Sequence, residues 1–429
     1  MSAEALTGGI PLEELLRVLF FQAGFNTAVV VAGTAALGLA GGTVGTFLLL
    51  RRRALVSDAL SHATLPGIAV AFLIGAALGL PGRSLPLLLA GAVVSGVLGL
   101  LTVQALARHT RLTEDSAIGA VLSVFFGLGI VLISYIQNLE LAGQAGLKTF
   151  ILGQTAAMAR GEAIAIGLLA AGAAAAVALL FKEFRALAFD PGFAAVQGWP
   201  VARLDLALMG LATLVTVIGL QTVGLILVVA LLIIPPAAAR FWTDRLALMT
   251  WLAAGIGALS GWLGATLSAL LPKMPAGAVI VLVAGFFFLL SFLFAPARGL
   301  AAAALRGLAL RAGYAERAAL VRLLAAEGGA PAPVLAAPLR LALAARGHLR
   351  GGRLTGRGRA AARRAERNRR LWERFLIDHP TLLPGQLRWG IDDIDEALPG
   401  DLVRLLEERD AQERNALARQ APAPGRLAS

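Results

Sequence analysis

The stretch TAVVVAGTAALGLAGGTVGTFLLLRRR, residues 27–53, decides the fold of this chain. Its first part carries no charged residue, and it ends in three consecutive arginines. About 20 predominantly apolar residues are enough for a helix to cross the hydrocarbon core of a bilayer, and basic residues gather on the cytoplasmic side. The stretch therefore predicts a membrane-spanning helix that runs inward and ends near Arg51.

Apolar runs of this kind recur over most of the chain. Of its 429 residues, 58% are hydrophobic and 15% are charged, whereas soluble domains are about 45–50% apolar and about 25% charged. We predict an all-α, polytopic transmembrane helical bundle of about nine spans, at residues 27–50, 57–80, 84–107, 117–137, 163–181, 204–220, 222–239, 246–271 and 276–295. The sixth span is short, and the turn at Gly219–Gly224 leaves the count between 204 and 239 open.

Basic residues mark one side of the predicted membrane. They follow the odd-numbered spans, at Arg51–Arg53, Arg108, Arg111, Lys182, Arg185, Arg240, Arg245 and Arg298. We therefore expect a multi-pass protein of the cell (inner) membrane, with its N-terminus outside and its C-terminus in the cytoplasm. The 49 glycines are interpreted as sites of close helix packing. The absence of cysteine excludes disulfides and thiolate chemistry.

Composition divides the chain into four regions. Residues 1–26 show helical spacing of leucines and form an amphipathic segment, and residues 27–297 form the transmembrane domain. Residues 298–416 are expected to form a small, mostly helical cytoplasmic domain, and 417–429 a disordered tail rich in proline. Of the net charge of +12, +9 lies from residue 298 onward, so this part can attract anionic membrane lipids.

The second predicted span contains the only histidine that lies within a span. It begins SDALSHATLPG, residues 57–67, which places Asp58 and His62 one helical turn apart on one face. An ionisable residue inside a membrane costs at least about 2.5–3.5 kcal/mol, and a carboxylate with an imidazole suits Mn, Fe(II) or Zn. The spacing fits equally well a simple hydrogen bond between a helix-start acid and a histidine. Pro66–Gly67 is expected to interrupt the helix one turn later.

Residues 51–67, RRRALVSDALSHATLPG, resemble the second-helix signature of permeases of the manganese/zinc/iron ABC importer family. Three further stretches fit the pattern of that family in the same order: FILGQ at 150–154, FDPGFA at 189–194 with Gly198, and VGLILVVALLIIP at 223–235 followed by AAAR at 237–240. The resemblance covers about residues 25–297.

The resemblance implies a permease homodimer that works with two separate cytoplasmic ATPase subunits and an external metal-binding protein. It implies that Asp58 and His62 are ligands on the path of the transported ion, which would be Mn, Zn or Fe. The sequence itself supports this division of labour, because it contains no Gly-Lys dipeptide and hence no P-loop. The chain is thus expected to be a transport subunit without enzymatic activity or a permanently bound cofactor, and ATP hydrolysis is expected on another chain.

The loop 186–200 is expected to couple the permease to the ATPase. In the resembling family this cytoplasmic loop docks on the ATPase, and the matching residues here are Phe189, Asp190, Pro191 and Gly198. An acid followed by proline is typical of a helix start, so a short amphipathic coupling helix is predicted. An ordinary connecting loop is the alternative.

The tail has a resemblance of its own. Residues 354–376, LTGRGRAAARRAERNRRLWERFL, are similar to the wing end and dimerisation helix of metal-dependent repressors of the diphtheria-toxin-repressor type. Those repressors have histidines where this chain has Arg369 and, nearby, Arg388, whereas the acid at Glu373 is kept. In the next helix, a Cys/His ligand set is replaced by acids, at Asp392, Asp395 and Glu396. Fixed positive charge repels a cation, so we predict only weak binding of divalent metal.

Specific DNA binding by the tail is not expected. Its winged-helix part, about 315–354, is broken by Gly328–Pro333 and shows no clear recognition helix. A docking or regulatory role is favoured. The sequence leaves open whether the tail senses metal, docks the ATPase or is vestigial.

Other function classes fit the sequence less well. An ion-driven secondary transporter would need a carboxylate relay and paired repeats, and only one charged pair is present. A permease for a metal chelate or vitamin would not need Asp58 and His62, and a membrane-tethered metal-responsive regulator would need an intact recognition helix. The sequence does not select among Mn, Zn and Fe.

Overall fold

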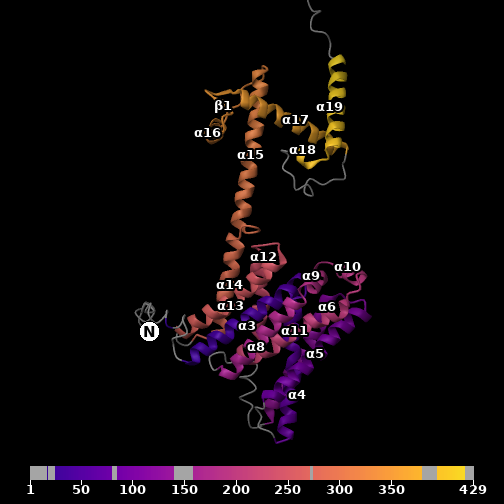
Figure 1. The fold of residues 1–429 in the computed structure, drawn as a ribbon, viewed down its shortest axis with the longest axis vertical. Coiled ribbons are helices and arrows are strands. Elements are labelled where there is room, and N and C mark those ends of the chain that lie inside the picture. Colours follow the sequence, from indigo (N-terminus) through magenta and orange to yellow (C-terminus); the bar gives the residue numbers. More distant parts are fainter. Residues whose placement is uncertain are drawn as a thin grey trace, which may run out of the picture. The chain divides into compact units, whose positions relative to one another are not determined.

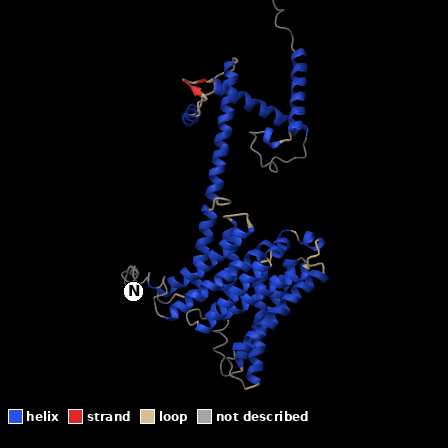
Figure 2. Ribbon diagram, in the orientation of Figure 1, coloured by secondary structure: helices blue, strands red, loops and turns tan. Residues whose placement is uncertain are grey.

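A computed structural model of the chain describes residues 17, 25–79, 85–139, 158–270, 274–378 and 394–420. These residues are almost all helical, as Figure 2 shows, which confirms the predicted all-α class. The chain divides into two compact units, Met1–Ala302 and Ala303–Ser429. Most of the predicted segment 1–26 lies outside the described residues, as do residues 150–154, Arg388 and Asp392.

The first unit contains eight helices that are long and apolar enough to cross a membrane. They are α3 (Phe25–Leu50), α4 (Ala54–Ala77), α5 (Leu85–His109), α6 (Glu114–Asn138), α8 (Arg160–Leu179), α11 (Val201–Val223), α13 (Leu246–Leu270) and α14 (Ala276–Phe294). A ninth apolar helix, α12 (Leu225–Arg240), has 16 residues. Each predicted span therefore corresponds to one helix, and α9 (Phe181–Phe189) and α10 (Pro191–Val196) are short additions.

The turn between the sixth and seventh spans consists of one residue, Gly224. Its φ of 86° lies in the left-handed region, which glycine adopts without a steric penalty. α11 continues to Val223, so the prediction of a short sixth span was wrong, and the seventh, α12, is the shorter one. A single residue is enough to separate the two helices because glycine can end one helix and begin the next.

The core of the first unit runs along α3, which contacts α8, α11, α12 and α13 (Figure 1). The contact with α13 depends on small residues. A Cβ atom built on Gly38 would lie 2.0 Å from the carbonyl oxygen of Gly257, so neither position has room for a side chain. Close backbone approach of this kind favours helix packing in membranes and confirms the packing role for these glycines, whereas others, such as Gly127 and Gly167, have no atom within 4 Å of a built Cβ.

The helix α4 passes through Pro66 without a break, so the predicted interruption was wrong. Its neighbour α5 supports it there. A Cβ atom on Gly67 would lie 2.0 Å from the carbonyl oxygen of Gly91, and the Ser95 hydroxyl donates a 2.6 Å hydrogen bond to the Ala63 carbonyl. Neighbouring helices and hydroxyl side chains commonly compensate proline in membrane helices.

The long helix α15 (Leu300–Glu327) crosses the boundary between the two units. Its first three residues belong to the first unit and the rest to the second. The second unit continues with α16 (Ala337–Ala345), the strands β1 (Leu349–Arg350) and β2 (Arg353–Leu354), α17 (Gly356–Asp378), α18 (Ile394–Ala397) and α19 (Gly400–Gln420). The strands form an antiparallel hairpin whose two turn residues, Gly351 and Gly352, both have positive φ. One small core joins α15, α16, the hairpin and α17, and another joins α17, α18 and α19.

The last helix, α19, continues past residue 416 to Gln420. Residues 417–420 therefore extend the helix into the segment for which we predicted disorder. They are Leu, Ala, Arg and Gln, which are good helix formers, and Pro422 stands beyond them.

Candidate functional site

The predicted pair on α4 is present with the expected geometry. Asp58 and His62 lie one turn apart on one face, and the distance from Asp58 Oδ1 to His62 Nε2 is 3.5 Å. This exceeds the length of a good hydrogen bond, so the two groups are close without being locked together. The Asp58 side chain is 36% exposed and that of His62 19%, so both remain accessible.

The His62 ring is held from one side by α6. It packs edge-on against the Phe126 ring, with centroids 4.7 Å apart. Its Nδ1 atom is buried and has no hydrogen-bond partner within the described part of the chain. Because Pro66 has no N–H, the carbonyl oxygen of His62 lacks its usual partner within the helix. A carboxylate, an imidazole and a backbone carbonyl therefore occur within two turns of α4.

This set is small for a permanent metal centre. Among the described residues, no three side chains of His, Cys, Asp or Glu come close enough to hold one ion. A tight divalent site usually has at least three protein ligands.

A second charged cluster, which sequence reasoning missed, lies beside the start of α4. Asp205, in the first turns of α11, is only 5% exposed and forms ion pairs with Arg51 and Arg53. The distance from Arg51 Nη2 to Asp205 Oδ1 is 3.3 Å, and Arg53 Nη1 donates to the other carboxylate oxygen. From the sequence, these arginines are interpreted as markers of orientation and as part of the second-helix signature, without a partner for their charge. The signal was available, because Asp205 is the one acid within the predicted span 204–220 and such an acid needs a partner.

The same cluster reaches the predicted coupling loop. Arg51 Nη1 donates a hydrogen bond of 3.2 Å to the carbonyl oxygen of Leu187, which is buried in α9. α9 also packs against α3, where the Phe47 ring contacts the rings of Phe181 and Phe184. The segment that leads into α10 is thereby tied to the end of α3.

The predicted helix start in the loop is confirmed. Asp190 caps α10, since its Oδ1 accepts a hydrogen bond of 2.9 Å from the Phe193 N–H, and Pro191 occupies the first turn. Gly198, with a φ of 85°, follows the helix. The large apolar residues of this segment are exposed, at Phe189, Phe193, Val196 and Trp199. Phe193 and Val196 lie on α10, and Phe189 and Trp199 flank it; exposed apolar side chains of this kind mark contacts with another protein or with the membrane.

In the tail, Asp395 of α18 faces an arginine. Asp395 pairs with Arg367 at 2.9 Å, and the hydrogen bonds from that guanidinium lower the pKa of the Asp395 carboxyl. Arg367 also pairs with Glu407 at 2.6 Å, and both acids raise its pKa. Arg369 pairs with Glu373 at 3.5 Å along the same helix. Arginines therefore engage the carboxylates of Asp395, Glu407 and Glu373.

The fold and these sites define a polytopic helical membrane protein with an ionisable pair on one spanning helix. Residues 25–295 match the model of the ABC 3 transport family, and the chain belongs to this family. It is therefore a membrane component of a transport system and not an enzyme.

Two curated relatives illustrate the similarity. The chain is 44% identical over 286 residues to the manganese transport system membrane protein MntC of Bacillus subtilis (strain 168). This alignment covers 67% of this chain and 65% of that protein. It is 41% identical over 270 residues to the zinc transport system membrane protein TroC of Treponema pallidum (strain Nichols). This alignment covers 63% of this chain and 89% of that protein.

A solved structure is also similar. PsaBC from Streptococcus pneumoniae, determined in complex with Fab, aligns with a TM-score of 0.57 and 32% sequence identity. The alignment covers 67% of this chain and 97% of the aligned chain.

Proposed function

We propose that this chain is the membrane-spanning permease subunit of an ATP-driven importer of a divalent transition metal ion, namely Mn, Zn or Fe. The observation that carries the proposal is the Asp58–His62 pair on one face of a spanning helix. The names of the relatives, a manganese and a zinc transport system, support this class of cargo and leave the individual metal open.

In this proposal the ion is held weakly on its way through. Asp58 supplies an oxygen and His62 a nitrogen, an O/N set that suits Mn, Fe(II) and Zn. Water and a second copy of the chain would supply the remaining ligands. Two side-chain ligands from each copy bind the ion loosely enough for release to the inside.

The proposed partners follow from the second site. The exposed apolar patch around α10 is assigned to a cytoplasmic ATPase subunit, because the chain has no P-loop of its own. In this proposal the patch and the C-terminus lie in the cytoplasm and the N-terminus lies outside, which the distribution of basic residues supports. An external metal-binding protein would deliver the ion, and two copies of the chain would form the permease.

Uptake of labelled ions tests the proposal. Cells without an importer of this kind would express the chain with its ATPase and delivery protein and receive radiolabelled Mn, Zn or Fe. We expect ATPase-dependent accumulation of at least one ion and its loss in His62→Ala. The exposed His109 at the end of α5 provides a matched control, His109→Ala. Uptake of an organic chelate or vitamin in place of the free ions would favour the alternative importer class.

A further inference from the structure

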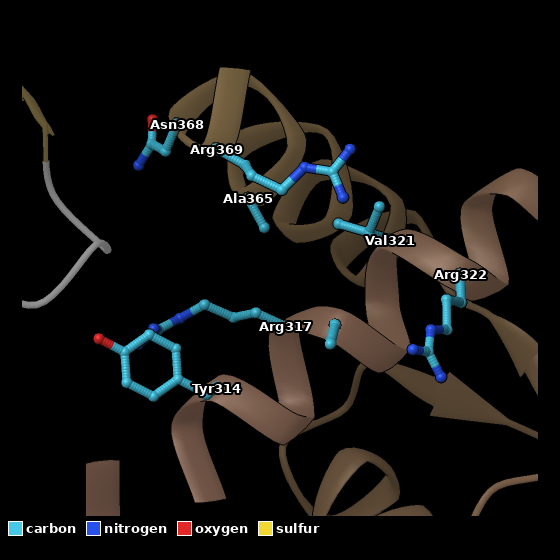
Figure 3. A pocket seen from close by; sticks show the side chains of 8 residues that line it. Tyr314, Arg317, Val321, Arg322, Ala365, Asn368 and Arg369 are labelled. Atoms are coloured by element: carbon cyan, nitrogen blue, oxygen red, sulfur yellow. The ribbon is translucent and has the colours of Figure 1, made fainter. Parts of the chain in front are cut away.

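The turn between α3 and α4 contains two arginine side chains that converge on one buried carboxylate. Arg51 and Arg53 both pair with Asp205 of α11. Arginines of the second unit are arranged differently. A cavity of about 290 Å³ between α15 and α17 is lined by three arginines, but Figure 3 shows their side chains pointing apart. The arginines of the turn, by contrast, act together on one group.

Arg51 also closes the end of α9. Its Nη1 atom donates a hydrogen bond of 3.2 Å to the carbonyl oxygen of Leu187. The last carbonyl groups of a helix lack partners within the helix, and a basic side chain both satisfies them and favours the negative end of the helix dipole. The carbonyl one position earlier, that of Ala186, already accepts from the Asp190 N–H. One guanidinium thus joins the last turn of α9, directly before α10, to Asp205 of α11.

The turn is short enough to pass a displacement on to α4. α3 ends at Leu50 and α4 begins at Ala54, so three residues separate the two helices. The N–H groups of Arg52 and Arg53 donate hydrogen bonds back to the last turn of α3, which holds the turn in one shape. Asp58 lies in the same continuous helix, about 6 Å along its axis from Ala54. A shift of the turn therefore also shifts Asp58.

We propose that Arg51 is a positioning residue that couples the α9–α10 segment to the ion ligands on α4. A movement of α9 acts on Arg51 through the last turn of α9, and the ion pairs with Asp205 keep the start of α4 in step with it. Energetic coupling between distant sites is carried by contiguous contacts that move together. Arginine suits this role because its planar guanidinium donates in several directions at once, whereas the ammonium of lysine is a compact point charge. The inference rests on the proposed function, in which the ATPase acts on α10 and the ion meets Asp58 and His62.

Thiol labelling of the complex tests the proposal, because the chain itself contains no cysteine. Asp58→Cys introduces one thiol at the ion pair. The full chain, assembled with its ATPase in proteoliposomes, reacts with a membrane-permeable maleimide with and without ATP and vanadate, and mass spectrometry measures the modification. The test variant is Arg51→Lys, which keeps the charge beside Asp205 and loses the simultaneous hydrogen bond to α9. Arg108→Lys makes the same change at an exposed arginine in the last turn of α5 and is the matched control.

We expect ATP with vanadate to change the labelling rate of the thiol about threefold or more in the parent and in R108K, and less than about twofold in R51K. Tm and pull-down of the ATPase should match the parent in both variants. In chains that retain Asp58, R51K should also lower the number of ions transported per ATP hydrolysed several-fold, while R108K should not.

An equal response of the thiol in R51K and R108K, or no response in the parent, would overturn the proposal. A large drop in Tm or a loss of ATPase association in R51K would do the same, because Arg51 would then be a structural or a docking residue. A normal thiol response without uptake of any metal would instead contradict the proposed transport function and leave the role of Arg51 intact.

Discussion

Two charged sites near the start of α4 differ in how their charges are satisfied. Asp205 is buried, and two arginines enclose it. Asp58 and His62, one turn further along α4, are partly exposed and 3.5 Å apart, and no third His, Asp or Glu among the described residues joins them in a cluster. A closed cluster inside a membrane protein stabilises an arrangement of helices, whereas an open pair retains ligand capacity for an ion that passes.

The comparison also separates two kinds of mutational effect. Removing one charge from a closed, buried cluster leaves the others uncompensated, which lowers the stability of the fold. Asp58 and His62 are both partly exposed, so when one of them is removed, water can still solvate the other. We therefore expect loss of folding at the first site and loss of transport alone at the second.

The largest effect is expected for Asp205→Asn. It removes the buried carboxylate with which the largely buried Arg51 and Arg53 side chains pair and should cost about 3–5 kcal/mol. Thermal unfolding in detergent measures this as a large drop in Tm, together with poor expression. The control is Asp244→Asn, which breaks the exposed pair with Arg298 and should cost about 0–1 kcal/mol. Equal Tm values for the two variants would contradict the assignment of a structural role to the buried cluster.

The second prediction concerns the open pair. Asp58→Asn or His62→Ala should abolish metal uptake, because each removes one of the two side-chain ligands, while Tm and pull-down of the ATPase stay close to wild type. Radiolabelled uptake and the pull-down measure the two quantities separately. Normal uptake by both variants would exclude these residues as ligands, and a large drop in Tm would make the pair structural, like Asp205.

A smaller effect is expected at the coupling segment. Asp190→Lys with Pro191→Ala removes the cap and the rigid start of α10, which should cost about 1 kcal/mol locally and weaken ATPase association or uncouple hydrolysis from transport. Transport-stimulated ATP hydrolysis in proteoliposomes measures the effect. Glu162→Lys is a matched charge reversal in the first turn of α8, on the side assigned to the exterior, and should leave coupling intact. If both variants couple normally, the ATPase docks elsewhere.

The smallest effect is expected in the tail. The pKa of Asp395 is lowered by Arg367, so this pair stabilises the folded tail above the unfolded pKa of the carboxyl, and the contribution is lost as pH falls through the lower folded value. Asp395→Asn should therefore increase hydrogen–deuterium exchange in α17 and α19 slightly at pH 7. The difference from wild type should disappear in strong acid. A difference that persists there would point to a cause other than charge.

The helices and the α4 pair could be predicted because their signals are local. Apolar composition marks each span, and a spacing of four residues places Asp58 and His62 on one face whatever the rest of the chain does. The Asp–Pro sequence likewise indicates a helix start. The continuity of α4 through Pro66 could not be predicted, because it depends on Gly91 and Ser95 of a neighbouring helix.

The sequence by itself determined the class of protein, the approximate positions of the spans and the acid–imidazole pair on one face of α4. Hydropathy and helical period act over a few turns and need no knowledge of neighbours. Only the tertiary structure decided that Arg51 meets Asp205, 154 positions away, and that it also reaches the Leu187 carbonyl of α9. Pairing across such separations depends on which helices pack together, and this is set by close contacts such as that of Gly38 with Gly257.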